Sequence, residues 1–140
     1  MVDALPDWDD GTVAILSTIG DAPHAIPVST AVRAGTRRVL LALALRRRSL
    51  ALLREQPVVA LTIVCGGDVA VTAHGRATVV AEPMRASDGV AAIALAVESI
   101  QDHGRDTFVI DGGVQWRWTD PDAERADAAV RAELRELAGG

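Results

Sequence analysis

Three consecutive arginines and a serine, Arg46 to Ser49, are the residues of this chain whose types and spacing point most directly to chemistry. They follow an apolar stretch and precede a short segment that stops at Pro57. Ser49 is suited to a helix N-cap, and proline commonly follows a helix end, so we expect a helix of about two turns here. Backbone N–H groups at a helix start and guanidinium donors both favour an anion. The sequence therefore predicts a phosphate site that would suit a phosphorylated cofactor.

The geometry of an extended segment limits this cluster. Neighbouring side chains of such a segment point in opposite directions, so at most two of Arg46, Arg47 and Arg48 can face one anion. The chain contains no lysine, and its basic residues are all arginine, which makes an arginine cluster less diagnostic. A solvated charge cluster, or a set of ion pairs at an interface, is the alternative interpretation.

Strands are expected to position this cluster. Apolar residues alternate or run together over residues 12–19, 25–32, 37–45, 57–65 and 69–81, and glycine-containing turn signals separate these segments. Gly66-Gly67 is a hairpin signal. Pro27 has no N–H group, so its strand is expected at a sheet edge or a bulge. Strands that precede helices indicate an α+β fold, here a closed antiparallel sheet of about six to seven strands in a single domain spanning residues 1–140.

The second half of the chain is expected to hold two helices and a hairpin. An alanine-rich stretch predicts a helix over residues 85–103, with four apolar residues at helical spacing: Val90, Ile93, Val97 and Ile100. Residues 107–110 and 114–118 predict a last hairpin. Asp120 as N-cap and Pro121 in the first position predict a C-terminal helix from Pro121 to Leu137. Asp127 and Arg131 lie at a supportive spacing on its charged face.

The motifs between residues 20 and 77 follow a recognisable order. A Gly-x-x-Pro-His-x-x-Pro-Val stretch precedes a strand, a basic segment, a short helix, an x-Pro-x-Val-Ala-Leu stretch and Gly-x-Ala. This order resembles the pyridoxamine 5'-phosphate oxidase-like, FMN-binding split β-barrel family. The resemblance covers roughly residues 11–81, and the remainder only by element order. Its residues are Gly20, Pro23, His24, Pro27, Val28, Pro57, Val59, Ala60, Leu61, Gly75 and Ala77.

The resemblance implies a homodimer that binds FMN in a groove between its subunits and transfers hydride to or from a small organic substrate. The phosphate would be held by Arg46, Arg47, Arg48 and Ser49. The isoalloxazine ring would lie along Pro27, Val28, Ser29 and Thr30. In the family a tryptophan of a late strand can wall the cofactor across the dimer interface, which implies this role for Trp116 or Trp118. Ordinary core packing is the alternative for both tryptophans.

Three other functions stay open. A deazaflavin could replace FMN, because its longer anionic tail would also need several arginines. Ser49 and Leu52 stand where the family usually has a lysine and an asparagine, which favours a barrel that has lost its cofactor and serves as a binding module. A haem-binding barrel would use His24 or His74 as axial ligand. The sequence names no catalytic residues.

The composition of the chain argues against several other classes of protein function. A net charge of −5 argues against a general nucleic-acid binder. No stretch reaches the ~18 apolar residues of a membrane span, so we expect no membrane partner. Cys65 is the only cysteine, which excludes an internal disulfide and fits a cytoplasmic protein. The three histidines are scattered, and we expect no metal site.

Overall fold

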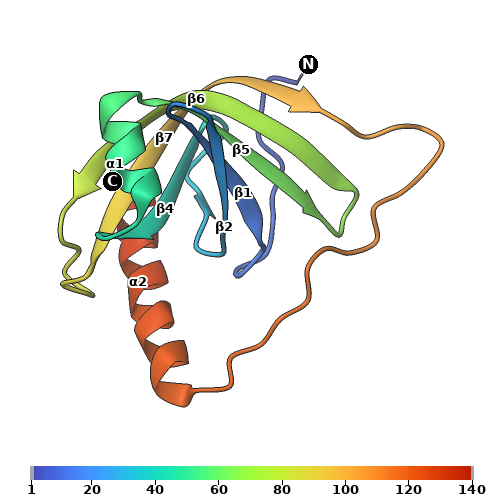
Figure 1. The fold of residues 1–140 in the computed structure, drawn as a ribbon. Coiled ribbons are helices and arrows are strands. Elements are labelled where there is room, and N and C mark those ends of the chain that lie inside the picture. Colours follow the sequence, from blue (N-terminus) through green and yellow to red (C-terminus); the bar gives the residue numbers. More distant parts are fainter. Residues whose placement is uncertain (1, 140) are drawn as a thin grey trace.

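A computed structural model describes residues 2–139 as one seven-stranded antiparallel sheet with two helices (Figure 1). The α+β class and the predicted number of strands are confirmed. The strands are β1 (Ala14–Ile19), β2 (Pro23–Val28), β3 (Val32–Arg33), β4 (Arg38–Ala44), β5 (Val58–Cys65), β6 (Val69–Ala81) and β7 (Val90–Asp102). The helices are α1 (Arg48–Glu55) and α2 (Pro121–Gly139).

The sheet curls because its two edge strands are close neighbours in the chain. The strand order is β2-β1-β5-β6-β7-β4-β3, so β2 and β3 form opposite edges, yet only residues 29–31 separate them in sequence. Thr30 lies in this link and extends the β3–β4 pairing with its side chain. Its Oγ1 accepts a hydrogen bond from the N–H of Ala42 at 3.0 Å and lies 3.4 Å from the carbonyl oxygen of Ala42. The position of Pro27 in an edge strand is as predicted.

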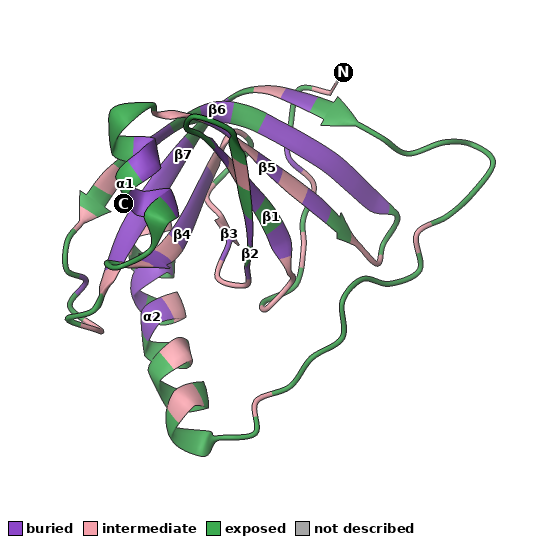
Figure 2. Ribbon diagram, viewed as in Figure 1, coloured by how far each residue is buried: buried purple, intermediate pink, exposed green. Residues whose placement is uncertain are grey.

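The curled sheet encloses one apolar core. Inward-facing side chains of six strands meet there with Leu50 and Leu53 of α1. The helix α1 lies across one end of the curled sheet (Figure 2). Burial of such side chains is the main favourable term in folding. Fully buried members include Leu16, Leu41, Leu61, Ile63, Ile93, Leu95 and Ile100.

A second apolar cluster lies outside the barrel, where α2 covers β4 and β7. Val130 and Leu134 of the helix pack there with Leu40, and with Ala92 and Ala94 of β7. The predicted helix start is confirmed, because the Oδ1 of Asp120 accepts a hydrogen bond from the N–H of Asp122 at 2.9 Å. The alanines of β7 are thus buried outside the barrel.

The buried carboxylate of Glu133 joins α2 to the loop before β7. Its exposed fraction is 6%, and its two oxygens accept hydrogen bonds from backbone N–H groups of Arg85 at 3.1 Å and Ala86 at 2.7 Å. Two hydrogen bonds compensate for removing this carboxylate from water. The contact fixes the β6–β7 connection against the helix.

The predicted helix over residues 85–103 is wrong, because most of this stretch forms β7. Ile93 and Val97 are four residues apart, which places them on one face of a strand as well as on one face of a helix. Ile100 would fall on the opposite face of a regular strand. The register shift that pairs His74 with Ser99 and Gly75 with Val97 inserts an extra residue in β7, and Ile100 returns to the interior. The β-bulge therefore produces a helix-like spacing in a strand.

The predicted hairpin over residues 107–118 is also wrong. This segment has no assigned strand and crosses from β7 to the start of α2 as a long arc (Figure 1). It lies against the β5–β6 turn instead. Asp68 donates its N–H to the carbonyl of Ile110 at 3.1 Å, and the N–H of Ile110 donates to Asp68 Oδ1 at 3.0 Å. The backbone N–H and the side-chain carboxylate of Asp68 thus make the hydrogen bonds to Ile110 that a second hairpin strand would have made.

Candidate functional site

The arginine cluster occupies the exposed turn between β4 and the start of α1. Arg46, Arg47 and Arg48 are all exposed, and none of them takes part in an ion pair or a side-chain hydrogen bond within residues 2–139. Seven other arginines of the chain form ion pairs. The cluster is therefore a concentration of positive charge whose guanidinium groups form no ion pair within the described chain.

The start of α1 differs from the prediction at Ser49. Arg47 is the N-cap, with φ −67° and ψ 134°, and it makes no side-chain capping bond. Ser49 is the second residue of the helix, has an exposed fraction of 0%, and its Oγ has no hydrogen-bond partner. The prediction of Ser49 as N-cap is wrong because the helix begins at Arg48, two residues earlier than a cap at Ser49 would require. Backbone N–H groups at this helix start, and not the Ser49 hydroxyl, are the donors available to an anion.

Grooves flank α1 on two sides. One, of about 350 Å³, runs between the β1–β2 turn and α1 and contains Arg48 together with Asp21 and Glu55. Two carboxylates outnumber one guanidinium in this groove, so it does not suit a phosphate. We therefore expect an anion to bind beside Arg46 and Arg47, which do not line this groove.

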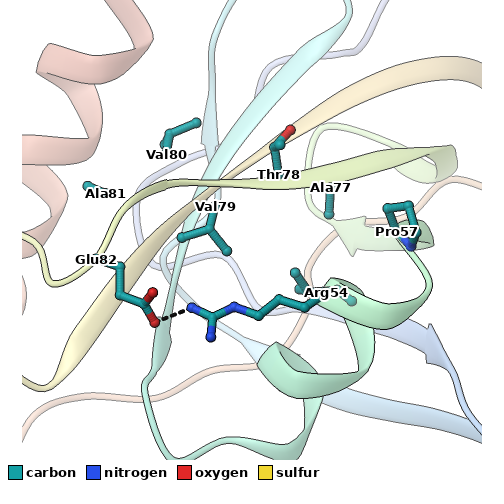
Figure 3. A pocket seen from close by; sticks show the side chains of 9 residues that line it. Arg54, Pro57, Ala77, Thr78, Val79, Val80, Ala81 and Glu82 are labelled. Atoms are coloured by element: carbon teal, nitrogen blue, oxygen red, sulfur yellow. Dashed lines mark hydrogen bonds and ion pairs between the residues drawn. The ribbon is translucent and has the colours of Figure 1, made fainter.

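The other groove, of about 570 Å³, lies between the C-terminal end of α1 and the end of β6 (Figure 3). Arg54 extends along it to form an ion pair with Glu82, while Pro57, Thr78 and Val80 line the remainder. The sequence analysis did not single out this groove. Arg54 and Glu82 are 28 residues apart, and only the return of β6 past the helix brings them together.

The four predicted ring contacts, Pro27 to Thr30, have different surroundings. Pro27 is exposed on the outer face of the sheet, whereas Val28 is 7% exposed and belongs to the core. Ser29 is half-buried, and the hydroxyl of Thr30 is engaged with the backbone of Ala42. Arg46 follows Ala42 by four residues, so the two residues are at most about 13 Å apart along an extended chain. The structure therefore brings Thr30 and the arginine cluster to neighbouring positions along β4.

Trp116 and Trp118 lie elsewhere. Their rings make a T-shaped contact with centroids 5.2 Å apart, and Trp116 Nε1 donates to the carbonyl of Gly11 at 2.8 Å. Gly11 lies just before the first residue of β1. Arg48 lines a groove together with Ile19, the last residue of β1. The six residues of β1 span about 20 Å. Within one chain the tryptophans and the arginine cluster are thus at opposite ends of β1.

Solved structures with the same arrangement of strands identify the fold. A protein assigned as a pyridoxamine 5'-phosphate oxidase from Lactobacillus delbrueckii aligns with a TM-score of 0.60 at 13% identity, over 71% of this chain and 95% of its own. A FAD-binding protein from Mesorhizobium loti aligns at 0.53 and 14% identity, over 64% and 83%. An F420 reductase aligns at 0.54 and 10% identity, over 69% and 98%. The fold is the split β-barrel.

Sequence comparison finds no relative of this split barrel. No family model matches the chain, and no curated protein matches it. The fold that the resemblance implied is confirmed, and the identities of 10–14% to these three structures carry no further statement about activity.

One outer face of the split barrel is apolar and uncovered. On β1, Ile15 and Ile19 have exposed fractions of 39% and 47%. Their partners on β2 are Pro27 and Pro23. A mainly apolar groove of about 310 Å³ continues this face across β5 to His74 of β6. The helix α2 packs on the β3-β4-β7 side of the sheet, and among the described residues no helix packs on the outer β2-β1-β5 face.

The histidines and the cysteine form no evident catalytic or metal centre. His24 is half-buried on β2, and His74 is exposed on β6. No three His, Cys, Asp or Glu side chains gather as a possible ligand set in the part of the chain that the structure describes. Burial raises the pKa of the Cys65 thiol above 9.0, and the negative charge of Asp9 adds to the effect. No helix of residues 2–139 has the length and apolarity needed to cross a membrane.

Proposed function

We propose that this split barrel is a flavin-dependent oxidoreductase: a homodimer that binds FMN between its subunits and transfers hydride to or from a small organic substrate. The observation that carries the proposal is the cluster Arg46, Arg47 and Arg48 at the start of α1, which forms no ion pair among the described residues, on a fold shared with a FAD-binding protein. Guanidinium groups and helix N–H groups are the donors that a phosphate needs.

The residues of this chain fit the phosphate end of FMN. Arg46 and Arg47 supply charge, and the backbone N–H groups of Arg48 and Ser49 supply donors. Pro27, Val28, Ser29 and Thr30 would address the ring mainly through their backbone, since Val28 is in the core and the Thr30 hydroxyl is already bonded. A bound flavin would supply two-electron redox chemistry, while the protein orients it and excludes water.

The proposed dimer would supply the tryptophans. Trp116 and Trp118 are at the opposite end of β1 from the cluster, so they would cover a ring held by the partner subunit's arginines. The exposed apolar face around Ile15 and Ile19 supports association, because uncovered apolar faces of this kind commonly mark protein contacts. The single cysteine supports the further proposal that the protein works in the cytoplasm.

The test is cofactor retention in a matched pair of variants. FMN affinity is measured by fluorescence quenching and by the visible spectrum after desalting. Replacing Arg46, Arg47 and Arg48 together by glutamine is expected to weaken FMN binding at least about 100-fold, because two charge-assisted hydrogen bonds are lost. Replacing Arg85, Arg105 and Arg125 by glutamine changes the net charge equally and should leave FMN binding unchanged. Equal affinity of both variants would contradict the phosphate assignment.

Two alternatives are separated by the same measurements. A deazaflavin is the alternative cofactor, favoured by three adjacent arginines and by the likeness to an F420 reductase. Its uptake in preference to FMN, with the same dependence on the cluster, would establish it. A cofactor-free binding module is favoured by the burial of Ser49, whose hydroxyl cannot reach a ligand. A protein that takes up neither cofactor would support that function.

A further inference from the structure

Three hydrogen-bonded side chains form a continuous row from β5 across β6 to the residue that follows β7. Thr62 Oγ1 of β5 lies 3.0 Å from Thr72 Oγ1 of β6, and Thr72 Oγ1 lies 2.8 Å from Nε2 of His103. Both distances are those of good hydrogen bonds. The backbone of His103 is itself anchored to β6, because its N–H donates to the carbonyl of Ala70 at 2.8 Å. The imidazole is therefore held beside the Thr72 hydroxyl.

The members of this row differ in their access to water. His103 is exposed, Thr72 is only 8% exposed, and Thr62 is half-buried. A hydroxyl both donates and accepts, so Thr72 can accept a hydrogen bond from one neighbour while it donates to the other. Imidazole gains and loses a proton near neutral pH and can do so at either ring nitrogen. The three groups thus form a path along which a proton can move between water and Thr62.

The strand register places Thr62 on the outer face of the half-barrel. Its neighbours along β5, Leu61 and Ile63, are in the core, so the Thr62 side chain points outward. Thr62 pairs with Ile15 of β1, and Ile15 pairs with Pro27 of β2. Adjacent strands are about 4.8 Å apart, which puts Pro27 and Thr62 about 10 Å apart with Ile15 between them. The path therefore ends on the same outer face that exposes Ile15.

The inference rests on the proposed function, in which the flavin ring lies along Pro27 to Thr30 at a contact between two subunits. A flat ring that rests on Pro27 and extends over Ile15 would end beside Thr62. Contact with a second subunit would exclude water from this region. A reaction that moves a hydride also requires a proton to be delivered or removed. In a region without water, that proton needs a route through the protein.

We propose that His103, Thr72 and Thr62 are a proton relay that connects the outer β2-β1-β5 face with solvent. His103 Nδ1 takes a proton from water, and Nε2 releases its own proton to Thr72 Oγ1. Thr72 passes its hydroxyl proton to Thr62 Oγ1, and Thr62 passes its own to the basic atom of the ligand beside it. One proton enters at His103, one leaves at Thr62, and the imidazole ends neutral. The reverse reaction uses the same transfers in the opposite order.

His24 provides a matched control for His103. It lies on β2 on the same side of the strand as Ile26 and Val28, which belong to the core, so it does not face the outer surface of the sheet. Its ring makes no hydrogen bond within residues 2–139, whereas the ring of His103 bonds to Thr72. Replacing His24 by glutamine thus removes an imidazole without interrupting the relay.

The first test uses the protein without cofactor and follows exchange of the Thr72 hydroxyl proton with water by NMR. The resonance is assigned by its loss in Thr72→Val. Because His103 carries the proton to water, His103→Gln should slow this exchange at least about tenfold, while His24→Gln should not change it. Exchange that is equally slow with and without His103, or too fast to observe in both proteins, would overturn the relay whether or not the protein binds FMN.

The second test uses the FMN-loaded protein after chemical reduction. Ferricyanide removes two electrons from the reduced cofactor, and one proton must also leave it. Thr72→Val and His103→Ala should slow this oxidation at least about tenfold. Free imidazole should restore the rate of His103→Ala, where it can occupy the vacated space, and not that of Thr72→Val, which lacks the hydroxyl. A merely structural role of His103 would not respond to imidazole in this way.

The two tests separate the relay from the cofactor assignment. Retained FMN with equal oxidation rates in all variants would overturn the relay and leave the proposed function intact. A wild-type protein that binds no FMN would contradict the proposed function, and the exchange of the Thr72 hydroxyl proton would still decide whether the relay exists.

Discussion

Gly75 of β6 lies so close to Ala96 of β7 that a Cβ at position 75 would stand 2.0 Å from the carbonyl oxygen of Ala96. The contact occurs at the bulge that restores Ile100 to the core. We predict that Gly75→Ala destabilises the fold by about 3 kcal/mol or more, because the obstructing atom belongs to backbone and cannot rotate away. Gly89→Ala, where nothing lies within 4 Å, should change the free energy of unfolding by less than about 0.5 kcal/mol. Urea denaturation of the two variants decides between these outcomes.

A second pair of glycines tests how the 103–120 segment is held. A Cβ on Gly113 would lie 2.7 Å from the carbonyl oxygen of Val64, whereas one on Gly112 would meet nothing within 4 Å. Gly113→Ala should therefore detach the segment from the β5–β6 turn, and Gly112→Ala should not. Hydrogen exchange at the N–H of Ile110, which bonds to Asp68, reports the detachment. Slow exchange at Ile110 in both variants would show that the close approach does not hold the segment.

The buried carboxylate of Glu133 is expected to matter more than an exposed ion pair. Glu133→Gln replaces one acceptor oxygen by a donor that faces a backbone N–H, which should cost about 1–3 kcal/mol. Glu136→Gln removes the exposed pair with Arg85 and should cost less than about 1 kcal/mol. Thermal and urea unfolding of both variants measure the difference. Similar losses would mean that the contacts of Glu133 with Arg85 and Ala86 contribute little.

Cys65 should react slowly with alkylating reagents near neutral pH. Burial, and secondarily Asp9, raise the pKa of its thiol, so less thiolate is present than for an ordinary cysteine. Above pH 9.0 the unfolded chain releases this proton first, and the folded state then binds more protons, so the contribution of Cys65 to stability falls as the pH rises. Iodoacetamide rates against pH should show a higher midpoint than free cysteine, and Asp9→Asn should lower that midpoint. A midpoint at or below that of free cysteine under the same conditions would contradict the prediction.

The apolar face on β1 and β2 can be tested independently of any cofactor. Ile15→Glu places a charge at a residue that is 39% exposed, so the fold should tolerate it while a dimer through this face should not. Val109→Glu is the control, because Val109 is 66% exposed and lies off this face. Sedimentation velocity should show monomers for Ile15→Glu and dimers for Val109→Glu. Dimers in both cases would mean that the subunits associate elsewhere.

Most of the fold follows from local pattern. β4, β5, β6 and α2 could be predicted because their apolar residues are continuous or regularly spaced and clear turn or cap residues bound them. β7 could not be predicted, because alanine has a high helix propensity and the bulge produces a helical spacing. Two of its alanines, Ala92 and Ala94, are buried in the outer cluster with Val130 and Leu134 of α2, and that burial is a tertiary feature. The extended segment before α2 was missed for a similar reason, since Ile110 pairs with Asp68, a turn residue 42 positions earlier.

Only the part of the candidate site that is contiguous in sequence could be predicted. Arg46 to Arg48 adjoin one another in sequence, so their common location needs no tertiary knowledge. The burial of Ser49 depends on how α1 closes the barrel, and the contact of Trp116 with Gly11 depends on how the segment before α2 returns to the start of β1.

The two prolines of β2 also determine how copies of this chain can meet. Pro23 and Pro27 are four residues apart on a strand that ends the sheet, so both lack an N–H on the same side of the backbone. An edge strand with missing donors is a poor template for another strand, which protects against edge-to-edge growth into aggregates. Two copies are thereby directed to contact through side chains of a sheet face, and a sheet continued from one molecule to the next is disfavoured at this edge.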